Sequence, residues 1–380
     1  MQGHSQFDYI IIGNGLAGLQ LALAMAHNNF FSKKTIALID PSPKNKNDRT
    51  WSFWETEPSA WNAITFKSWS NAQILTANHT IALNLSPYSY KSIRAIDFYD
   101  YATSELARYP NFTFFIEEVI AVKEEPSVLV QTNNGHYAAT HVFDSRIPID
   151  FFINNTSLKI NQHFKGIVIK TKKKIFNDRS FTMMDYRLKD GPKTTFMYVL
   201  PFSQTEALIE FTYFTEQLVS DDVYDRFITK YITTYLNLTD YDIVETEQGN
   251  IPMTNFPFYR YNTQNITKIG TAGGWVKPST GYSFKHTEKK VSKIIANIVA
   301  GNSPSKQLFK KKYRFYDKIF LSVLKNNNDK GEWIFKQFYS KNSPNTMFRF
   351  LDENSTFWEE LQIMWSLLSW QFIKAFFKTL

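Results

Sequence analysis

Apolar and polar positions at the start of the chain follow the order strand, helix, strand. Residues 9–12 form an apolar run typical of a buried strand, and residues 35–40 form a second run that ends in the acidic Asp40. Between the two runs, a glycine-rich turn precedes apolar residues at helical spacing, namely Leu16, Leu19, Leu23 and Ala26. The pattern predicts a β-α-β unit.

The middle of the chain has the alternation of antiparallel strands, and its last part has helical spacing. Residues 119–142 alternate around Asn134-Gly135, a dipeptide that favours a tight hairpin, and predict a meander that returns to the first sheet. Alternating stretches between 166 and 214 predict a second, antiparallel sheet. Residues 291–299 predict a helix, and the chain beyond Gly301 has a helical pattern throughout.

Composition indicates a folded chain and excludes several kinds of chemistry. Of 380 residues, 43% are hydrophobic and 21% are charged, which suits a large core rather than disorder. Because the chain has no cysteine, a disulfide framework, a thiolate nucleophile and Cys-ligated metal sites are excluded. The histidines lack ligand spacing, so we expect no metal site. The 34 Phe, 20 Tyr and 9 Trp indicate an apolar cavity or lipid contact, or a compositional bias of the genome.

The net charge of +8 leaves nucleic acid and an anionic membrane as possible partners, and its position favours the membrane. Basic residues cluster over 285–318 and are interleaved with aromatic residues, a mixture that suits a phospholipid surface. A solvated helix face is the alternative.

Residues 357–380 have an apolar side that polar residues interrupt. The apolar positions at helical spacing are Trp358, Leu361, Trp365, Leu368 and Phe372. The stretch predicts a helix that lies in the membrane interface, with a core helix as the alternative. Because we find neither a signal peptide nor a spanning apolar run, we expect a cytoplasmic, peripherally membrane-associated protein.

The glycine turn after the first strand has the pattern of a dinucleotide-binding site. Gly13, Gly15 and Gly18 form G-x-G-x-x-G between a strand and a helix, and Leu16 and Ala17 open that helix. A pyrophosphate can approach such a turn closely and is stabilised by the helix N-terminus. Asp40 lies about 20 residues further on, at a strand end where a carboxylate can accept hydrogen bonds from a ribose.

The glycine pattern alone fits both FAD and NAD. A second glycine-rich segment, residues 270–283, lies late in the chain before the helix at 291–299. Together with the early β-α-β unit and the meander, this order favours FAD. Backbone N–H groups at such a helix start can face the electron-rich pyrimidine side of a reduced flavin.

Five short segments carry a resemblance to a known family. They are Arg49-Thr50-Trp51-Ser52-Phe53, Met184-Asp185-Tyr186-Arg187, Leu208-Ile209-Glu210-Phe211-Thr212-Tyr213, Pro278-Ser279-Thr280-Gly281-Tyr282-Ser283 and Arg314-Phe315-Tyr316-Asp317. In these, and nearly end to end, the chain resembles the bacterial type of lycopene β-cyclase, within the flavoprotein superfamily of geranylgeranyl reductases and aromatic hydroxylases. Glu210 matches the essential glutamate of that family. Phe211 is a departure, because bacterial relatives usually carry a second acid there.

Pattern and resemblance together predict an α/β fold. We expect a Rossmann-type FAD-binding domain over 1–150 and 262–300, an inserted substrate domain with an antiparallel sheet over 151–261, and a helical C-terminal region over 301–380. The resemblance implies that FAD is held by Gly13, Gly15, Leu16, Ala17, Gly18, Asp40, Arg49, Gly273, Pro278, Thr280, Gly281 and Tyr282.

The resemblance also implies an activity. Such cyclases turn the acyclic ends of lycopene into β-ionone rings, through γ-carotene to β-carotene, without net redox change, yet need FAD in its reduced form, with NAD(P)H as the electron source. The partners are then membrane-dissolved lycopene and an anionic membrane surface, without nucleic acid or metal. A flavin-dependent prenyl reductase or hydroxylase and a non-catalytic carotenoid-binding flavoprotein are the alternatives.

Alternation along 207–214 bears on Glu210 independently of the resemblance. Leu208, Glu210 and Thr212 share one face of the strand, so the neighbours of Glu210 are mostly apolar. Burial can raise the pKa of a glutamate to ~8–9, which would keep it protonated as a proton donor; a solvent-facing glutamate is the alternative. The sequence leaves open whether Glu210, Asp185 or the flavin delivers the proton. Aromatic residues predicted to cover the cations are Trp51, Phe53, Trp54, Tyr186 and Tyr282, with core packing as the alternative for each of them.

Overall fold

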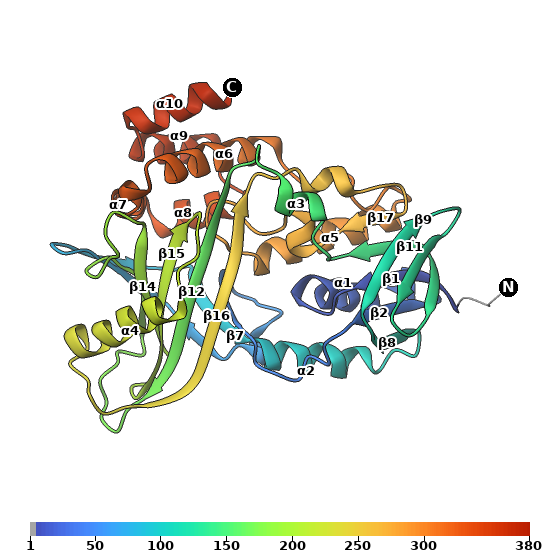
Figure 1. Cartoon of the computed structure of the whole chain (residues 1–380), viewed down its shortest axis with the longest axis horizontal. Coiled ribbons are helices and arrows are strands. Elements are labelled where there is room, and N and C mark those ends of the chain that lie inside the picture. The colour runs from blue at the N-terminus through green and yellow to red at the C-terminus, as the bar shows by residue number, and fades with distance from the viewer. Residues whose placement is uncertain (1–4) are drawn as a thin grey trace.

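The computed structural model describes residues 5–380, in which two large sheets, a small third sheet and a layer of helices at one end are seen (Figure 1). The first sheet has the order β8-β2-β1-β11-β10-β9, with β17 beside β11. Its strands are β1 (Ser5–Ile12), β2 (Ile36–Asp40), β8 (Phe112–Ile116), β9 (Val119–Glu124), β10 (Val128–Thr132), β11 (His136–Asp144) and β17 (Ile266–Lys268). Because β1 pairs in parallel with β2, and β9, β10 and β11 pair as an antiparallel meander, both predicted motifs are confirmed.

Helices cover one face of the first sheet and the meander covers the other. α1 (Leu16–Ala26), α2 (Ala95–Leu106) and α5 (Phe284–Val299) pack on the first face. On the opposite face, Ile10, Ile12 and Ile39 pack against Val128 and Val130 of the meander. The strands are therefore apolar on both sides, as expected for parallel strands buried on both faces.

The second sheet, mainly antiparallel, has the order β16-β12-β15-β14-β13-β5-β6. Its strands are β5 (Asn71–Leu75), β6 (Thr80–Asn84), β12 (Lys159–Lys170), β13 (Ser180–Asp185), β14 (Thr195–Pro201), β15 (Glu206–Thr215) and β16 (Asp242–Thr254). α4 (Asp221–Tyr235) packs on one face of this sheet. β5 lies within the range predicted for the FAD-binding domain but pairs with β13, because Ala72 and Ile74 are buried in the core of the second sheet. The domain boundaries stay a prediction.

A small third sheet joins the two large ones. It contains β3 (Thr50–Thr56), β4 (Lys67–Trp69) and β7 (Tyr88–Arg94), in the order β3-β7-β4. A short helix, α3 (Ile149–Ile153), lies between β11 and β12 in the chain.

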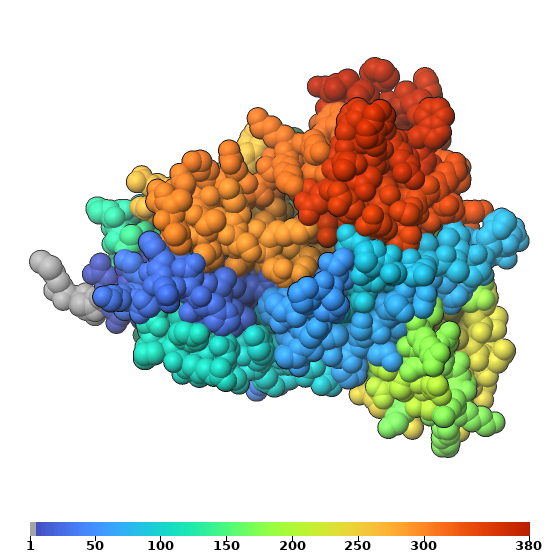
Figure 2. Space-filling view, turned by 180° about the vertical axis from the view of Figure 1, so that it is seen from behind, coloured from blue at the N-terminus to red at the C-terminus, as the bar shows by residue number. Residues whose placement is uncertain are grey.

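The chain beyond Gly301 is helical, as predicted. Its helices are α6 (Lys311–Asn326), α7 (Gly331–Lys341), α8 (Pro344–Leu351), α9 (Phe357–Ser366) and α10 (Trp370–Thr379). The amphipathic stretch 357–380 forms two helices, because α9 ends at Ser366 and Ser369 caps α10 by accepting a hydrogen bond from the Phe372 N–H. These residues, red in Figure 2, project at one end of the molecule. No helix within residues 5–380 has the length and apolar content to cross a bilayer.

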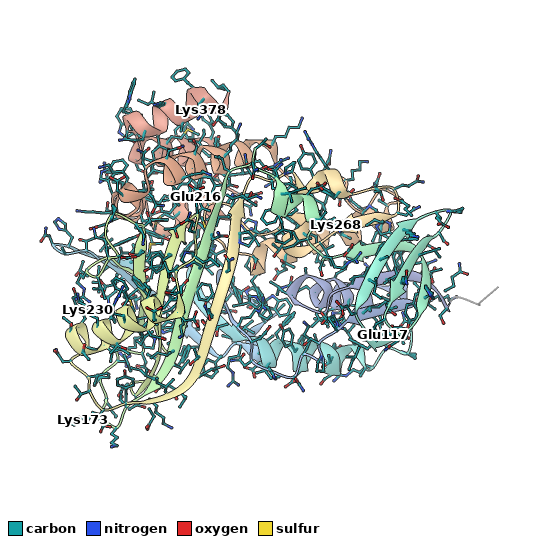
Figure 3. The ribbon with its side chains drawn as sticks, viewed as in Figure 1. Glu117, Lys173, Glu216, Lys230, Lys268 and Lys378 are labelled. Carbon is teal, nitrogen blue, oxygen red and sulfur yellow. The ribbon has the colours of Figure 1, made fainter. Side chains whose placement is uncertain are left out.

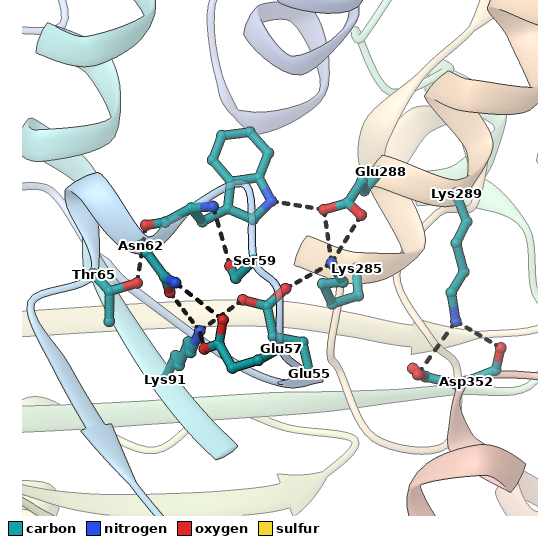
Figure 4. Close-up of polar contacts among 11 residues, drawn as sticks. Glu55, Glu57, Ser59, Asn62, Thr65, Lys91, Lys285, Glu288, Lys289 and Asp352 are labelled. Carbon is teal, nitrogen blue, oxygen red and sulfur yellow. Dashed lines mark hydrogen bonds and ion pairs between the residues drawn. The ribbon is translucent and has the colours of Figure 1, made fainter. Parts of the chain in front are cut away.

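Several lysines of the basic cluster are held inside the fold (Figure 4). Lys285 pairs with Glu55 at 2.9 Å, and Lys289 pairs with Asp352 at 3.3 Å. Lys290 is buried and donates a hydrogen bond to a backbone carbonyl. These three lysines of α5 are therefore engaged within the fold, whereas Lys293, Lys306, Lys310, Lys311, Lys312 and Arg314 are exposed, and membrane contact through residues 285–318 stays a prediction.

Candidate active site

The turn between β1 and α1 allows a ligand to approach the backbone closely. A Cβ at Gly18 would lie 2.0 Å from the carbonyl oxygen of Gly13, so only glycine fits there. Gly15 caps α1 without a side-chain hydrogen bond, and a Cβ on it would meet nothing within 4 Å. Leu16 and Ala17 follow at the start of the helix, whose first N–H groups can bind an anion. The turn therefore fits the pyrophosphate of a dinucleotide.

Asp40 lies beside this turn but is already engaged by its own chain. Its carboxylate accepts hydrogen bonds from the N–H groups of Asn14, at 2.7 Å, and Ser42, at 2.8 Å. Lys44 pairs with it at 3.1 Å. The carboxylate thus stabilises the glycine turn, and its contact with a ribose stays a prediction.

A cavity of about 400 Å³ separates the second sheet from β3 and the loop before α5. Six of the predicted site residues, which belong to three of the five motifs, lie on its wall. They are Arg49, Trp51, Glu210, Thr280, Gly281 and Tyr282. These residues come from segments that are far apart in the chain. We refer to this space as the central cavity.

The loop 278–283 forms one wall of the central cavity. Gly281 has φ +75°, and a Cβ there would lie 1.9 Å from Gln162 Oε1, so the loop packs tightly against β12. The Thr280 hydroxyl is buried and lacks a hydrogen-bond partner within the described residues. Tyr282 shares a hydrogen bond of 2.8 Å with the hydroxyl of Tyr90. The unpartnered hydroxyl is available to a ligand in the cavity.

Not all predicted residues reach the central cavity. Gly273 is buried in the turn before the loop, and Pro278 lines a separate cavity beside Lys277. Phe53 stacks on Phe284 at 4.3 Å between ring centroids, and Tyr186 is buried in the core with its hydroxyl on the Met184 sulfur. The roles predicted for these four residues stay predictions.

Glu210 is buried on the wall of the central cavity. The predicted alternation is confirmed, since Leu208, Glu210 and Thr212 all line the cavity. The Thr212 hydroxyl donates a hydrogen bond of 2.5 Å to Glu210 Oε1. Burial raises the pKa of Glu210 to about 8, and the charge of Glu247 adds to the rise. The side chain can therefore carry a proton at neutral pH.

Four residues form one row across the second sheet on the cavity side. Tyr198 of β14 is paired with Glu210 of β15, Glu210 with Gly166 of β12, and Gly166 with Glu247 of β16. Directly paired residues point to the same face, so both carboxyl groups face the cavity. A Cβ on Gly166 would lie 3.2 Å from the Glu210 Cβ, so the missing side chain leaves room between the two acids.

Glu247 is a site residue that the sequence analysis missed. It lines the central cavity, and burial raises its pKa to about 7, although a hydrogen bond from Thr50 lowers it. A second acid at position 211 would not reach the cavity, because Phe211 stacks on Phe227 of α4 behind the sheet. The second carboxyl group of the site thus comes from β16, two strands away.

Asp185 lies on the other side of the second sheet. It is fully buried, pairs with Arg187 at 2.6 Å and accepts a hydrogen bond of 2.9 Å from Tyr231 of α4. It does not line the central cavity. The geometry favours a structural role for this residue, and proton delivery by it stays a prediction.

A buried ion pair links two of the motifs. Lys277, directly before the loop 278–283, lies 2.9 Å from Asp317 of α6 and 3.2 Å from Glu353 after α8. Both Lys277 and Asp317 are almost fully shielded from solvent. The helical layer therefore fixes the loop that forms the wall of the central cavity.

Comparison with known proteins assigns a family. The family model described as lycopene cyclase protein matches residues 8–379. Lycopene beta cyclase of Capsicum annuum is 24% identical over 320 residues, which cover 77% of this chain and 60% of that protein. Neoxanthin synthase of Solanum tuberosum is 24% identical over 315 residues, which cover 79% of this chain and 62% of that protein. The chain thus spans about 60% of the length of these relatives.

Solved structures share the fold at low sequence identity. A geranylgeranyl bacteriochlorophyll reductase-like protein of Thermoplasma acidophilum has a TM-score of 0.64 and 13% identity, with 100% of both chains covered. Halogenase PltM in complex with phloroglucinol and FAD has a TM-score of 0.57 and 10% identity, with 90% of this chain and 78% of that chain covered. The predicted α/β fold, that of FAD-dependent oxidoreductases, is confirmed.

Proposed function

Because the chain belongs to the lycopene cyclase family, we propose that it closes the acyclic ends of lycopene into β-ionone rings, giving γ-carotene and then β-carotene. The single observation that carries this proposal is a buried glutamate, Glu210, that faces an aromatic cavity and has its pKa raised to about 8. An acid of this kind can protonate an alkene in surroundings from which water is excluded. The reaction is an isomerisation with no net change of redox state.

Glu210 and Glu247 divide the proton transfers between them. Glu210 gives its proton to the second carbon of the terminal alkene, which leaves a tertiary cation on the first carbon. The internal alkene attacks this cation and closes a six-membered ring, and the new cation loses a ring proton to the Glu247 carboxylate. One proton enters and one leaves, so the atoms balance once a proton passes back from Glu247 to Glu210.

Aromatic side chains protect the cations from water. Trp51 and Tyr282 lie on the wall opposite the sheet, and Tyr198 is the cross-strand neighbour of Glu210. Their ring faces attract positive charge by about 0.5–2 kcal/mol each. A cation formed in this cavity is therefore stabilised and shielded from water.

The residues around the central cavity fit FAD as the cofactor. The glycine turn Gly13–Gly18 would hold the pyrophosphate, and Arg49, Thr280, Gly281 and Tyr282 would lie beside the ring system. The unpartnered hydroxyl of Thr280 and the unpartnered amide oxygen of Asn14 support this fit. Reduced FAD, when bound, supplies an electron-rich ring that stabilises positive charge nearby. Its reduction by NAD(P)H stays a prediction.

The helices α9 and α10 are proposed to rest on the membrane that holds the substrate. They expose large apolar side chains, including Trp358, Trp365, Trp370 and Phe377, each at least 70% exposed. A soluble surface rarely carries so many in one place. We therefore propose a peripheral attachment through these two helices.

The function is tested by anaerobic incubation of the protein with lycopene liposomes and pre-reduced FAD. We expect cyclic products of unchanged mass and no stoichiometric consumption of NAD(P)H. A product heavier by two hydrogens would indicate a reductase, and a product with an added oxygen in a parallel aerobic incubation would indicate a hydroxylase, which needs O2. Lycopene recovered unchanged under both conditions would indicate a carotenoid-binding flavoprotein and would contradict the proposal.

The proposed roles predict a narrow, bell-shaped pH dependence of ring formation. Turnover needs protonated Glu210, so activity is lost as the pH rises through its raised pKa of about 8. Turnover also needs ionised Glu247, so activity is lost as the pH falls through its raised pKa of about 7. Because Glu210 and Glu247 interact, the two apparent pKa values of the pH profile describe the pair and not either residue alone. Initial rates with pre-reduced FAD across both values check the profile.

The variant Glu247→Gln distinguishes the acidic from the basic limb of the pH profile. Because this variant has no base at position 247, we expect a lower rate and no acidic limb. Glu245→Gln, two residues earlier on β16, is the matched control and should keep both limbs, with the acidic limb moved to lower pH because the charge of Glu245 contributes to the raised pKa of Glu247. An acidic limb that persists unchanged in Glu247→Gln would contradict the role of Glu247.

A further inference from the structure

A second cavity, of about 280 Å³, lies inside the helical layer. Its wall is formed by apolar side chains of α6 to α10, among them Phe320, Phe338, Ile363 and Phe372. The polar side chains on the wall include Ser279 and Thr280 of the loop 278–283, and Asp317, which is paired with Lys277. We refer to this space as the helical cavity.

The helical cavity and the central cavity share part of their walls. Thr280, Phe335 and Tyr339 line both. Phe335 and Tyr339 belong to α7 and are buried, and Thr280 lies in the loop that follows Lys277. The two spaces are therefore neighbours, separated by a wall of a few side chains.

The other end of the helical cavity reaches the outer surface. Met364, Leu368, Phe376 and Phe377 line it and are also exposed, by 42%, 53%, 40% and 70%. All four lie on α9 and α10 or between them, at the end of the molecule where the chain projects (Figure 2). Lys378 of α10 marks the same end and lies far from Lys173 at the tip of the second sheet (Figure 3). The helical cavity thus extends from the exposed aromatic surface to the wall that it shares with the central cavity.

We infer that the helical cavity is a binding site for the long apolar chain of a polyene whose reacting end lies in the central cavity. The inference rests on the proposed function and adds where the unreacted part of the substrate is held and from which side it enters. A chain of forty carbons exceeds what the central cavity can enclose. The helical cavity adjoins it across Thr280, Phe335 and Tyr339, is lined by the side chains that such a chain would contact, and opens among side chains suited to lipid. A chain that occupies both cavities would displace the side chains between them.

The chemistry of the wall supports this occupant over others. Because Asp317 is neutralised by Lys277, the helical cavity presents no free charge to a phosphate or carboxylate group. A peptide would bring backbone N–H and C=O groups that need partners, which a wall of phenylalanine and leucine side chains does not provide. A hydrocarbon chain has no such need, and its burial is favourable at about 25 cal/mol per Å² of apolar surface.

The test fills the helical cavity without touching the central one. Ile373→Trp adds bulk to a partly buried side chain that lines the cavity, and Lys374→Trp adds the same bulk to the exposed neighbouring position of α10. A second matched pair on α9 is Met364→Trp, which lines the cavity, and Gln362→Trp, which does not. Each variant is assayed with lycopene and with a short acyclic isoprenoid that carries the same end group.

We expect kcat/KM for lycopene to fall at least tenfold in the two cavity variants. Their kcat/KM for the short substrate should stay within about twofold of the wild-type value. The two control variants should keep both values. An equal fall of kcat/KM for both substrates, or no fall of kcat/KM for lycopene in either cavity variant, would overturn the inference. The short substrate thus distinguishes a blocked cavity from damaged chemistry.

Binding of lycopene provides a readout that does not depend on turnover. Pigment retained after gel filtration is measured for the wild type and for each variant. If the wild type fails to cyclise either substrate but retains lycopene, and Ile373→Trp does not, the proposed function fails while the cavity assignment stands. If the wild type and both cavity variants retain equal amounts, or none, the cavity assignment is wrong.

Discussion

Replacement of Glu210 by glutamine is expected to lower kcat for ring formation by about 10²–10⁴-fold, the contribution that a positioned general acid makes. Glutamine keeps the shape of the side chain and can still accept the hydrogen bond from Thr212. It has no acidic proton to give to the alkene. Because Glu210 is buried with a raised pKa, the wild-type residue is largely uncharged near neutral pH, and the stability of the variant should change little.

The matched control for this variant is Glu206→Gln, the same substitution at the start of the same strand and outside the central cavity. Product formation is measured by pigment chromatography, and retention of FAD is measured from the absorbance of the purified protein. Glu206→Gln should keep full activity, and both variants should retain FAD. Full ring-forming turnover by Glu210→Gln would exclude this residue as the donor and leave the flavin or Asp185 in that role.

The position of Glu210 was predictable because strand alternation is a local property of the sequence. With a period of two, Leu208, Glu210 and Thr212 must share a face, and Phe211 must point away. Glu247 was not predictable in this way. It faces Glu210 only because β12 pairs with both β15 and β16 and places Gly166 between the two acids. Such a row depends on the register of three strands, which the sequence of one strand does not contain.

The aromatic residues of the motifs show a related limit. Trp51 and Tyr282 line the central cavity, whereas Phe53 and Tyr186 are part of the packed interior. Aromatic character predicts burial in both cases, because the packed interior and the wall of the cavity are both apolar surroundings. Trp51 and Phe53 lie on the same side of β3, so the elements that pack along the strand decide which of the two rings reaches the cavity. Residue type alone therefore identified the cavity as aromatic but not the members of its wall.

Lys285 and Lys289 show the same limit of the sequence pattern. Their spacing is visible in the sequence, but the acids that bind them come from β3 and from the chain after α8. A lysine that pairs with such a carboxylate has its charge compensated, which lowers what it can contribute to membrane binding. The exposed cations between residues 293 and 314 and the apolar side chains of α9 and α10 remain available to lipid.

Replacement of Lys277 by methionine is expected to cost about 3–5 kcal/mol of unfolding free energy, the effect of removing one partner of a buried ion pair. The methionine fits the space of the lysine stem but leaves the carboxylates of Asp317 and Glu353 without their cation. Chemical denaturation followed by fluorescence measures the loss. Because Lys277 precedes the loop 278–283, FAD retention should fall as well.

Lys172→Met is the control, since Lys172 and Asp240 form an ion pair in which both side chains are largely exposed. It should leave the unfolding free energy unchanged within error, because water screens an exposed pair. Replacing both buried partners, in Lys277→Met with Asp317→Leu, should recover part of the lost stability, since fewer charges are then left unpaired. If Lys277→Met is as stable as Lys172→Met, the ion pair does not hold the loop, and the wall of the central cavity must be fixed by the packing of α6 and α7 alone.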